Sequence, residues 1–279
     1  MKRNEGQVTS RKTPGPTLHQ ITVAPDAPKA VVAIIHGYAD YGARYAHVQA
    51  AWADQGIASI AIDLRGHGYA EGMRGYCEHF DEFLGDAAEL EGLVKDAFPG
   101  VPAFLFGHSF GGLIAGTIGA RGIGGYRGIL LSNPYFELAL KVSGAKVLLG
   151  KVASRFAPKL AIPAGLGGAA LTHDPKVAAA YDADPLVFKK ATARWFTEAT
   201  RAQAEAIAGA PQMKAPLYVA LGTGDVVASP NGGRAFFAAA GSTDKIKREW
   251  PELRHELLNE LEWRPVADAM AEWVLERAG

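Results

Sequence analysis

Short, continuous apolar runs recur along the chain, and they constrain its fold more than any other feature of the sequence. A strand that is apolar at every position is covered on both faces, as in a parallel sheet with crossover helices on either side. Amphipathic stretches of helical length separate the runs, so the sequence predicts an α/β fold with a mostly parallel, doubly wound sheet. The predicted strands are residues 31–35, 57–62, 102–106, 128–131 and 217–221. The predicted helices are residues 43–54, 80–97, 109–120, 192–208 and 265–277.

The alternation of strands and helices is interrupted once, over residues 136–188. This stretch mixes Leu, Ala, Gly and Pro, with a short basic helix predicted at residues 145–156. Because the alternation resumes afterwards, we expect the stretch to fold as a cap inserted into the sheet domain. The core then consists of residues 1–135 and 189–279, and residues 1–17 are expected to be a mobile tail.

The charge balance argues against nucleic acid as a partner, because 29 basic residues offset 29 acidic ones and leave no overall positive field. A single cysteine, Cys77, cannot form an internal disulfide, which fits a reducing compartment. No apolar run approaches the roughly 20 residues that a membrane-spanning helix needs, and the basic start lacks the apolar stretch of a secretory signal. We therefore expect a cytoplasmic protein, and no feature points to an obligate protein partner.

One motif indicates a specific chemistry: Gly107-His108-Ser109-Phe110-Gly111 lies between a predicted strand and a predicted helix. In a G-x-S-x-G turn the serine hydroxyl projects above the end of the sheet, and the glycines avoid clashes where strand and helix approach each other. The helix that follows directs free N–H groups and its positive end toward this hydroxyl. Ser109 is therefore the predicted nucleophile.

A serine hydroxyl is a weak nucleophile at neutral pH, so it needs an imidazole to accept its proton and a carboxylate to orient that imidazole. In folds with this nucleophile turn, the acid and then the base follow the serine along the chain. His255 comes after a short predicted strand at residues 246–250, and Asp225 follows the strand that ends at residue 221. These two are the predicted base and acid, whereas Asp244 precedes its nearest strand and is expected to be a solvated turn residue.

Stabilisation of an oxyanion needs two backbone N–H donors near the serine. The amide of Phe110, the residue after the nucleophile, is the first. The loop after the first predicted strand, His36-Gly37-Tyr38, supplies the second, which we assign to the amide of Tyr38. The ring of Tyr38 is then available to line an acyl pocket.

Several other candidate residues are interpreted as structural. His67 lies in a Gly-rich turn far from the end of the chain where a base is expected, and His108 flanks the nucleophile. His255-Glu256 begins a segment similar to a zinc helix, but the second histidine of H-E-x-x-H is missing. We therefore predict no metal site, and Cys77 is interpreted as an ordinary thiol.

With these motifs the chain resembles the monoacylglycerol lipase and lysophospholipase branch of the α/β-hydrolases, a group often labelled serine aminopeptidase-like. The resemblance covers residues 31–273. It implies an α/β-hydrolase fold with a cap over an acyl tunnel, no metal or cofactor, and hydrolysis of glycerol or phosphoglycerol esters of one fatty acid. The segments that carry it are His36-Gly37, Arg44-Tyr45, Asp63-Leu64-Arg65-Gly66-His67-Gly68 and residues 107–112, 171–188, 222–227 and 255–260.

On this resemblance Asp40, Arg44 and Leu258 are the candidate substrate contacts. The loop after His-Gly in this family often has an acidic residue followed by histidine, whereas this chain has Asp40-Tyr41. Animal monoacylglycerol lipases have a second histidine three residues after the catalytic one, which helps to bind the glycerol end, and here that position is Leu258. The departures leave the predicted triad unchanged and leave the head group of the substrate open.

The predicted function is hydrolysis of a fatty acyl ester, of the monoacylglycerol or lysophospholipid type, through an acyl-enzyme on Ser109. Apolar cap segments at residues 147–149 and 160–166 indicate a lipid substrate and transient contact with a micelle or membrane surface. Burial of these segments as plain cap core is the other interpretation.

Two alternatives stay open. An aminopeptidase of the same fold would need cap carboxylates to hold the substrate amine, for which Asp174, Asp182 and Asp184 are the candidates, although they have the pattern of helix-boundary residues. A non-catalytic receptor would use the same pocket to bind a small ligand.

Overall fold

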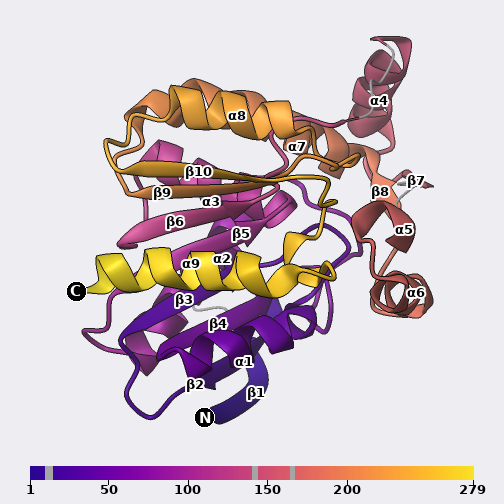
Figure 1. Cartoon of the computed structure of the whole chain (residues 1–279). Coiled ribbons are helices and arrows are strands. Elements are labelled where there is room, and N and C mark those ends of the chain that lie inside the picture. The colour runs from indigo at the N-terminus through magenta and orange to yellow at the C-terminus, as the bar shows by residue number, and fades with distance from the viewer. Residues whose placement is uncertain (10–14, 140–143, 164–166) are drawn as a thin grey trace.

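The computed structural model describes residues 1–9, 15–139, 144–163 and 167–279 (Figure 1). Within them, one eight-stranded sheet has the order β1-β2-β4-β3-β5-β6-β9-β10. Neighbouring strands are parallel from β4 to β10, and β1 and β2 are added antiparallel at one edge. These strands are β1 Lys2–Thr9, β2 Thr17–Ala24, β3 Ala30–Ile35, β4 Ile57–Asp63, β5 Ala103–His108, β6 Gly128–Ser132, β9 Leu217–Gly222 and β10 Lys245–Trp250.

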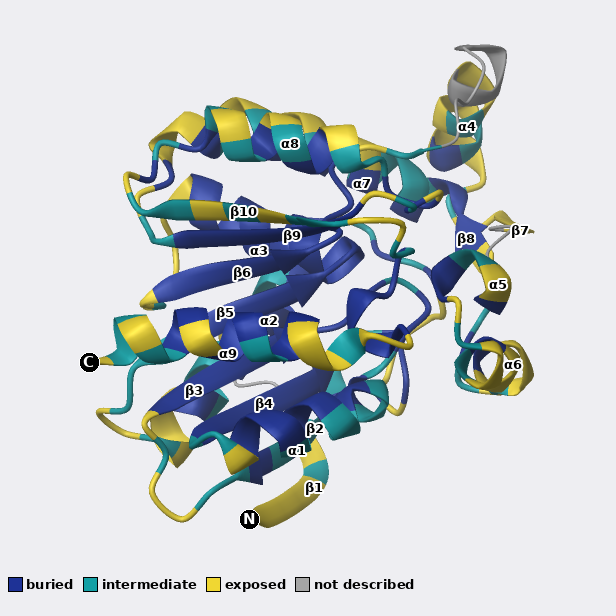
Figure 2. Cartoon of the chain, viewed as in Figure 1, coloured by how far each residue is buried: buried dark blue, intermediate teal, exposed yellow. Residues whose placement is uncertain are grey.

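Helices cover both faces of the sheet, and each face has its own apolar cluster. Adjacent residues of β5 show the division: Phe104 packs with Trp52 of α1 and Met270 of α9, whereas Leu105 packs with Phe83 of α2 on the other face, which α3, α7 and α8 also cover. Figure 2 shows the central strands buried throughout. This arrangement confirms the predicted α/β fold and explains why the strands are apolar at every position. The helices are α1 Ala46–Asp54, α2 Asp81–Ala97, α3 Phe110–Arg121, α7 Ala193–Gly209, α8 Pro230–Ala239 and α9 Trp263–Ala278.

The N-terminal segment differs from the prediction of a tail over residues 1–17. Lys2–Thr9 forms β1, which pairs residue by residue with β2 from Lys2 opposite Ala24 to Thr9 opposite Thr17. Most of its side chains are exposed, so backbone hydrogen bonds to β2 hold it in place with little help from apolar burial. Residues 10–14 lie outside the described part of the chain.

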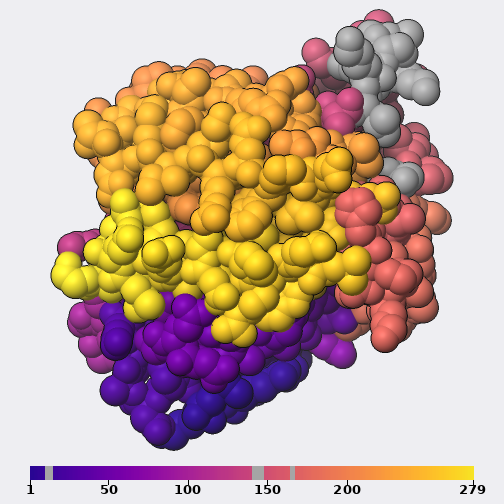
Figure 3. Space-filling view, in the orientation of Figure 1, coloured from indigo at the N-terminus to yellow at the C-terminus, as the bar shows by residue number. Residues whose placement is uncertain are grey.

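The predicted insertion at residues 136–188 contains most of a group of elements that lie beyond the carboxyl ends of the parallel strands (Figure 1). The predicted helix at residues 145–156 is α4, which protrudes from the outline of the core (Figure 3). Residues 164–166 and the side chain of Val147, which belong to the predicted apolar segments, are outside the description. We call this group the cap: α4 Gly144–Phe156, β7 Ala161–Pro163, α5 Gly168–Leu171, α6 Pro175–Ala183 and β8 Lys190–Thr192, with β7 and β8 paired antiparallel.

The parallel strands bring the loops that follow β3, β5, β6, β9 and β10 to one edge of the sheet, beneath the cap. Ligand sites of open α/β sheets lie at this edge. A search of the described helices finds none that is both long and apolar enough to cross a membrane.

Candidate active site

The turn between β5 and α3 places Ser109 in a strained conformation at the edge of the sheet. Its φ of 51° and ψ of −114° lie outside the regions that side-chain-bearing residues favour. The two flanking glycines are required by close approach: a Cβ on Gly107 would lie 2.2 Å from the carbonyl oxygen of Gly111, and one on Gly111 would lie 2.2 Å from that of Ile35. The sequence thus forms a tight turn that holds the hydroxyl away from the strand and toward the cavity below the cap.

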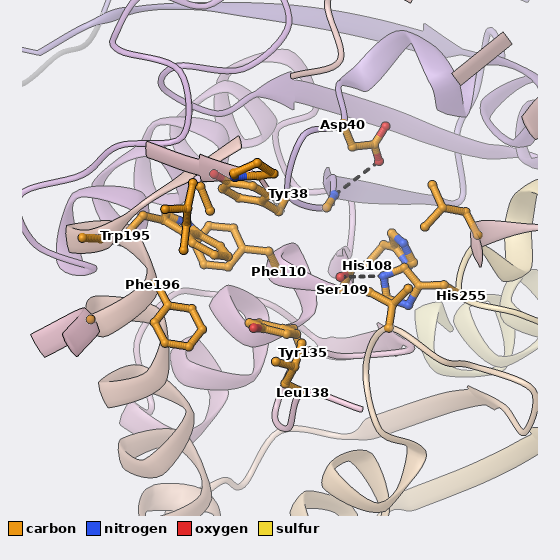
Figure 4. Close-up of a pocket in the computed structure, with 18 of the residues that line it drawn as sticks. Tyr38, Asp40, His108, Ser109, Phe110, Tyr135, Leu138, Trp195, Phe196 and His255 are labelled. Atoms are coloured by element: carbon orange, nitrogen blue, oxygen red, sulfur yellow. Dashed lines mark hydrogen bonds between the residues drawn. The ribbon is translucent and has the colours of Figure 1, made fainter. Parts of the chain in front are cut away.

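The structure brings the predicted nucleophile, base and acid together. The Nε2 atom of His255 lies 2.8 Å from Oγ of Ser109 (Figure 4), and its Nδ1 atom lies 2.7 Å from Oδ2 of Asp225. The other carboxylate oxygen of Asp225 accepts hydrogen bonds from the amides of Val227 and Ala228 at 2.8 and 3.1 Å. An ionised Asp225 therefore accepts from Nδ1–H, which leaves the Nε2 lone pair facing the serine hydroxyl.

Electrostatics distinguish His255 from the histidine beside it. Burial lowers the pKa of His255, but the charge and hydrogen bond of Asp225 outweigh burial, and the net pKa is above the ordinary value. His108 is buried without such a partner, and burial together with the nearby His255 lowers its pKa to about 3. His108 is thus neutral at neutral pH, with Nδ1 3.2 Å from the carbonyl of Ser132, and His255 alone of the two faces the serine hydroxyl.

The predicted oxyanion donors lie next to the serine. Phe110 is the first residue of α3, so its N–H has no partner within the helix. The loop of Gly37 and Tyr38 runs beside Ser109, since a Cβ on Gly37 would lie 3.3 Å from that of Ser109. The Tyr38 ring packs against Trp195 with ring centroids 3.8 Å apart, and its hydroxyl donates to the carbonyl of Lys190 at 2.8 Å. Tyr38 and Phe110 both also line the cavity beside Ser109.

A cavity of about 400 Å³ opens beside Ser109 and extends under the cap. Ser109 and His255 lie at one side of it, and Trp195 and Phe196 line the side away from His255 (Figure 4). Leu149 from α4, with Leu160 and Ile162 around β7, completes the apolar lining. The volume and lining fit a site for one small, mainly apolar molecule.

A cluster of paired charges lies beside the serine end of the cavity. Arg44 donates to both carboxylate oxygens of Glu256 at 2.7 Å and to Oδ1 of Asp40 at 2.9 Å. Burial raises the pKa of Asp40, but the charges of Arg44, His36 and His108 and the hydrogen bond from Arg44 together outweigh burial and lower that pKa to about 2. Tyr45 donates its hydroxyl hydrogen to Asp40 at 3.0 Å. Asp40 and Glu256 both line the cavity, so its polar end holds two carboxylates whose charge one guanidinium offsets in part.

Of the three candidate substrate contacts, the structure places Asp40 in the cavity wall and Arg44 behind it, but it contradicts the assignment of Leu258. That side chain is buried in the apolar cluster under α1 and α9, while its carbonyl lies 2.6 Å from Nε2 of His47. The third residue after His255 is directed inward because residues 257–259 form a short 3-10 helix. Glu256, which the sequence did not identify as a candidate substrate contact, lines the cavity instead.

The residues interpreted as structural lie away from reactive positions. His67 is buried, and burial lowers its pKa to about 3. Burial raises the pKa of the Cys77 thiol well above its usual range. Asp244, the rival acid, pairs with Arg277 at 2.7 Å. Among the described side chains, no group of three or more His, Cys, Asp or Glu residues could hold a metal ion.

Comparisons with known proteins show which family the chain is similar to. The family model described as serine aminopeptidase, S33, matches residues 26–262. The chain is 33% identical over 249 residues to the monoacylglycerol lipase of Mycolicibacterium smegmatis, which covers 89% of each protein, and 32% identical over 247 residues to the phospholipase YtpA of Bacillus subtilis, which covers 88% of this chain and 94% of the relative. The solved structure of a Paleococcus ferrophilus monoacylglycerol lipase superposes with a TM-score of 0.84 at 26% identity, over 93% of this chain and 99% of that one.

Proposed function

The chain belongs to the serine aminopeptidase S33 family of α/β-hydrolases, and from this premise we propose that it hydrolyses carboxylic esters of single fatty acids, with Ser109 as nucleophile. Its relatives named for monoacylglycerol lipase and phospholipase activity make it a carboxylic ester hydrolase. The observation that carries the finer proposal is the continuous hydrogen-bonded chain from Ser109 through His255 to Asp225, at the end of an apolar cavity.

In the proposed mechanism, Nε2 of His255 accepts the hydroxyl proton as Oγ of Ser109 attacks the ester carbonyl. The amides of Tyr38 and Phe110 donate to the oxyanion of the tetrahedral intermediate. His255 then protonates the departing alcohol and leaves an acyl-enzyme, which water hydrolyses by the same two proton transfers. Asp225 stays ionised throughout and stabilises the imidazolium that forms in each half-reaction.

The cavity supports a fatty acyl chain as the acid part of the substrate. An acyl group attached to Ser109 would extend along apolar side chains, including those of Phe196 and Leu149. Its methylene groups would therefore leave water on binding. The carboxylates of Asp40 and Glu256 lie at the serine end, where they can accept hydrogen bonds from alcohol hydroxyl groups. A hydroxylated leaving group of the monoacylglycerol or lysophospholipid type fits this end.

The outer surface of the cap supports transient contact with a lipid surface as the route of substrate entry. Leu149, Leu160 and Ile162 line the cavity and are also more than half exposed, which places its mouth on the outside of the cap. Leu148 and Phe156 of α4 extend this apolar surface, with 65% and 79% of their area exposed. Apolar surface gathered at a cavity mouth is typical of a site that meets a lipid aggregate.

The three cap carboxylates that the aminopeptidase alternative would use for a substrate amine all have partners within the described part of the chain. Asp174 caps α6 through the amides of Lys176 and Val177, and Asp182 pairs with Lys189 at 2.9 Å. The third candidate, Asp184, accepts from the hydroxyl of Tyr41 at 2.6 Å and from the amide of Leu186 at 2.8 Å. Near Ser109, Asp40 and Glu256 are both paired to Arg44 as well, so each of these five carboxylates already has a partner.

Replacement of Ser109 by Ala tests the proposal. We expect turnover of p-nitrophenyl butyrate and of a monoacylglycerol to fall by about four to six orders of magnitude, because only oxyanion stabilisation and binding remain. A panel of monoacylglycerols, lysophospholipids and amino-acid amides on the unaltered protein then identifies the substrate class. Ester turnover retained by S109A would overturn the nucleophile, and preferred cleavage of amides would restore the peptidase alternative. Ligand binding without any turnover would favour the receptor.

A further inference from the structure

Asn133 follows β6 and lies between the elements that carry the nucleophile and the acid. In the sheet order, β6 is flanked by β5, which leads to Ser109, and by β9, which leads to Asp225. Asn133 is 2% exposed and has a φ of 39°, in the left-handed region that asparagine tolerates better than most residues. The energetic cost of a strained, buried polar residue at the edge of a sheet must be offset by the contacts that the residue makes.

The side-chain amide of Asn133 makes such contacts, because it forms hydrogen bonds to the loops of both the acid and the base. Its Nδ2 donates to the carbonyl oxygens of Arg254 and His255 at 2.9 and 2.8 Å. Its Oδ1 accepts from the amide of Gly222 at 2.7 Å, at the end of β9. The backbone amide of Asn133 also donates to the carbonyl of Ala220 at 2.9 Å. Both donor hydrogens of one amide group thus hold the loop of the base, and its oxygen holds the loop of the acid.

The residues on either side of Asn133 bond to the nucleophile turn. The carbonyl of Ser132 accepts from the amide of Ser109 at 3.0 Å, and the amide of Tyr135 donates to the carbonyl of Ser109 at 2.9 Å. Segment 132–135 therefore contacts the loops of Ser109, Asp225 and His255 at once. Asn133 itself has no role in the proposed chemistry of bond cleavage.

We propose that Asn133 is a positioning residue, whose amide fixes the loop of His255 against the loops of Asp225 and Ser109. The proposal depends on the proposed roles of those three residues. Asparagine suits the position because it combines two donors and an acceptor on a short side chain with tolerance of a left-handed backbone. Loss of the amide leaves two buried carbonyl oxygens and one N–H without their partner, so the loop that carries His255 can shift, and a shift of about 1 Å can cost about 100-fold in rate.

Asn133→Gly is the principal test, because glycine keeps the left-handed backbone without strain and removes only the amide. We expect kcat for p-nitrophenyl butyrate to fall by about 10- to 100-fold with KM changed by less than about threefold, since the cavity wall is untouched. Asn133→Asp tests the same contacts at constant volume. Its second carboxylate oxygen would face the carbonyls of Arg254 and His255, and we expect kcat to fall at least as far as in N133G. If N133G is not recovered folded, N133D decides the outcome.

Gln49→Ala is the matched control. Gln49 is also a fully buried amide that donates to a backbone carbonyl, that of Ile21 at 3.2 Å, but it lies in α1. We expect Q49A to lower the melting temperature while kcat stays within about twofold of wild type. A kcat within twofold of wild type in N133G or N133D, or an equal loss in Q49A, would overturn the positioning role. If S109A is inactive in the same assay, that result leaves the proposed function intact, whereas an active S109A overturns both.

Discussion

The sheet edge around Ser109 and the outer part of the cap differ in the burial and hydrogen bonding of their side chains. At the sheet edge, His255 and Asp225 are buried and hydrogen-bonded, and Asn133 reaches the loops of the acid and the base. In α4 and β7, by contrast, apolar side chains such as Leu148 and Ile162 are more than half exposed. The proposed reacting groups are thus fixed by a dense network, whereas the apolar side chains for which we propose contact with lipid stay largely exposed.

The largest effect expected from breaking the network is that of Asp225→Asn. We expect kcat/KM to fall by about 10⁴-fold, because the amide favours the wrong tautomer of His255. The wild-type pKa of His255 lies above its ordinary value owing to Asp225, and the base must be unprotonated to act. Wild-type activity is therefore lost as pH falls through that raised pKa, and the residual activity of D225N should persist to lower pH. A pH profile of kcat/KM measures both effects.

Asp244→Asn is the control for this prediction, because Asp244 is the rival candidate for the acid in the sequence and pairs with Arg277 away from the serine. We expect kcat/KM within about twofold of wild type. A loss in D244N as large as that in D225N would contradict the assignment of the acid.

The next effect concerns stability rather than rate. Arg44→Met leaves the buried carboxylates of Asp40 and Glu256 without their positively charged partner, which should lower the free energy of unfolding by about 3–5 kcal/mol. Arg121 also contacts two carboxylates but is 36% exposed, so Arg121→Met should cost at most about 1 kcal/mol. Urea unfolding at neutral pH measures the free energy of unfolding of both variants. Equal losses of this free energy would show that the charge cluster beside the cavity stabilises the protein no more than a surface ion pair does.

The smallest effect is expected on the cap. Replacement of both Leu148 and Phe156 by Ser removes apolar surface outside the cavity, so KM for micellar monoacylglycerol should rise several-fold, with about 1 kcal/mol lost for the two side chains together. Turnover of soluble p-nitrophenyl butyrate should not change. Ile123→Ser, at an exposed position after α3, is the control and should affect neither. An equal rise in KM for both substrates would contradict a role limited to the lipid surface.

The sequence predicted the sheet closely where strands are buried on both faces. Predicted residues 31–35 and 217–221 are β3 and β9 to within one residue. β1 was missed because its side chains are polar and exposed, and antiparallel pairing with β2 leaves no apolar signal. β2 alternates between buried and partly exposed positions, a signal that was available but unused.

The part of the site that could be predicted from the sequence is the part for which the chemistry requires particular residue types in a fixed order along the chain. Ser109, Asp225 and His255 follow from that order, and the structure brings them within hydrogen-bonding distance. Glu256 and Asn133 could not be found in this way, because their roles come from contacts between segments far apart in the chain. The one signal for Asn133 is its position at the end of a buried strand and directly before a proline. This pattern indicates a turn, but it does not indicate the hydrogen-bond partners of the side chain.

The central claim is that His255 activates Ser109 across the edge of the sheet. Reaction with a fluorophosphonate, followed by peptide mass spectrometry and by the rate of labelling, tests it most directly, because the reagent reports the activated hydroxyl itself. We predict one adduct, on Ser109, formed at least about 100-fold more slowly in His255→Ala. An adduct on another residue, or an unchanged labelling rate in the variant, would contradict it.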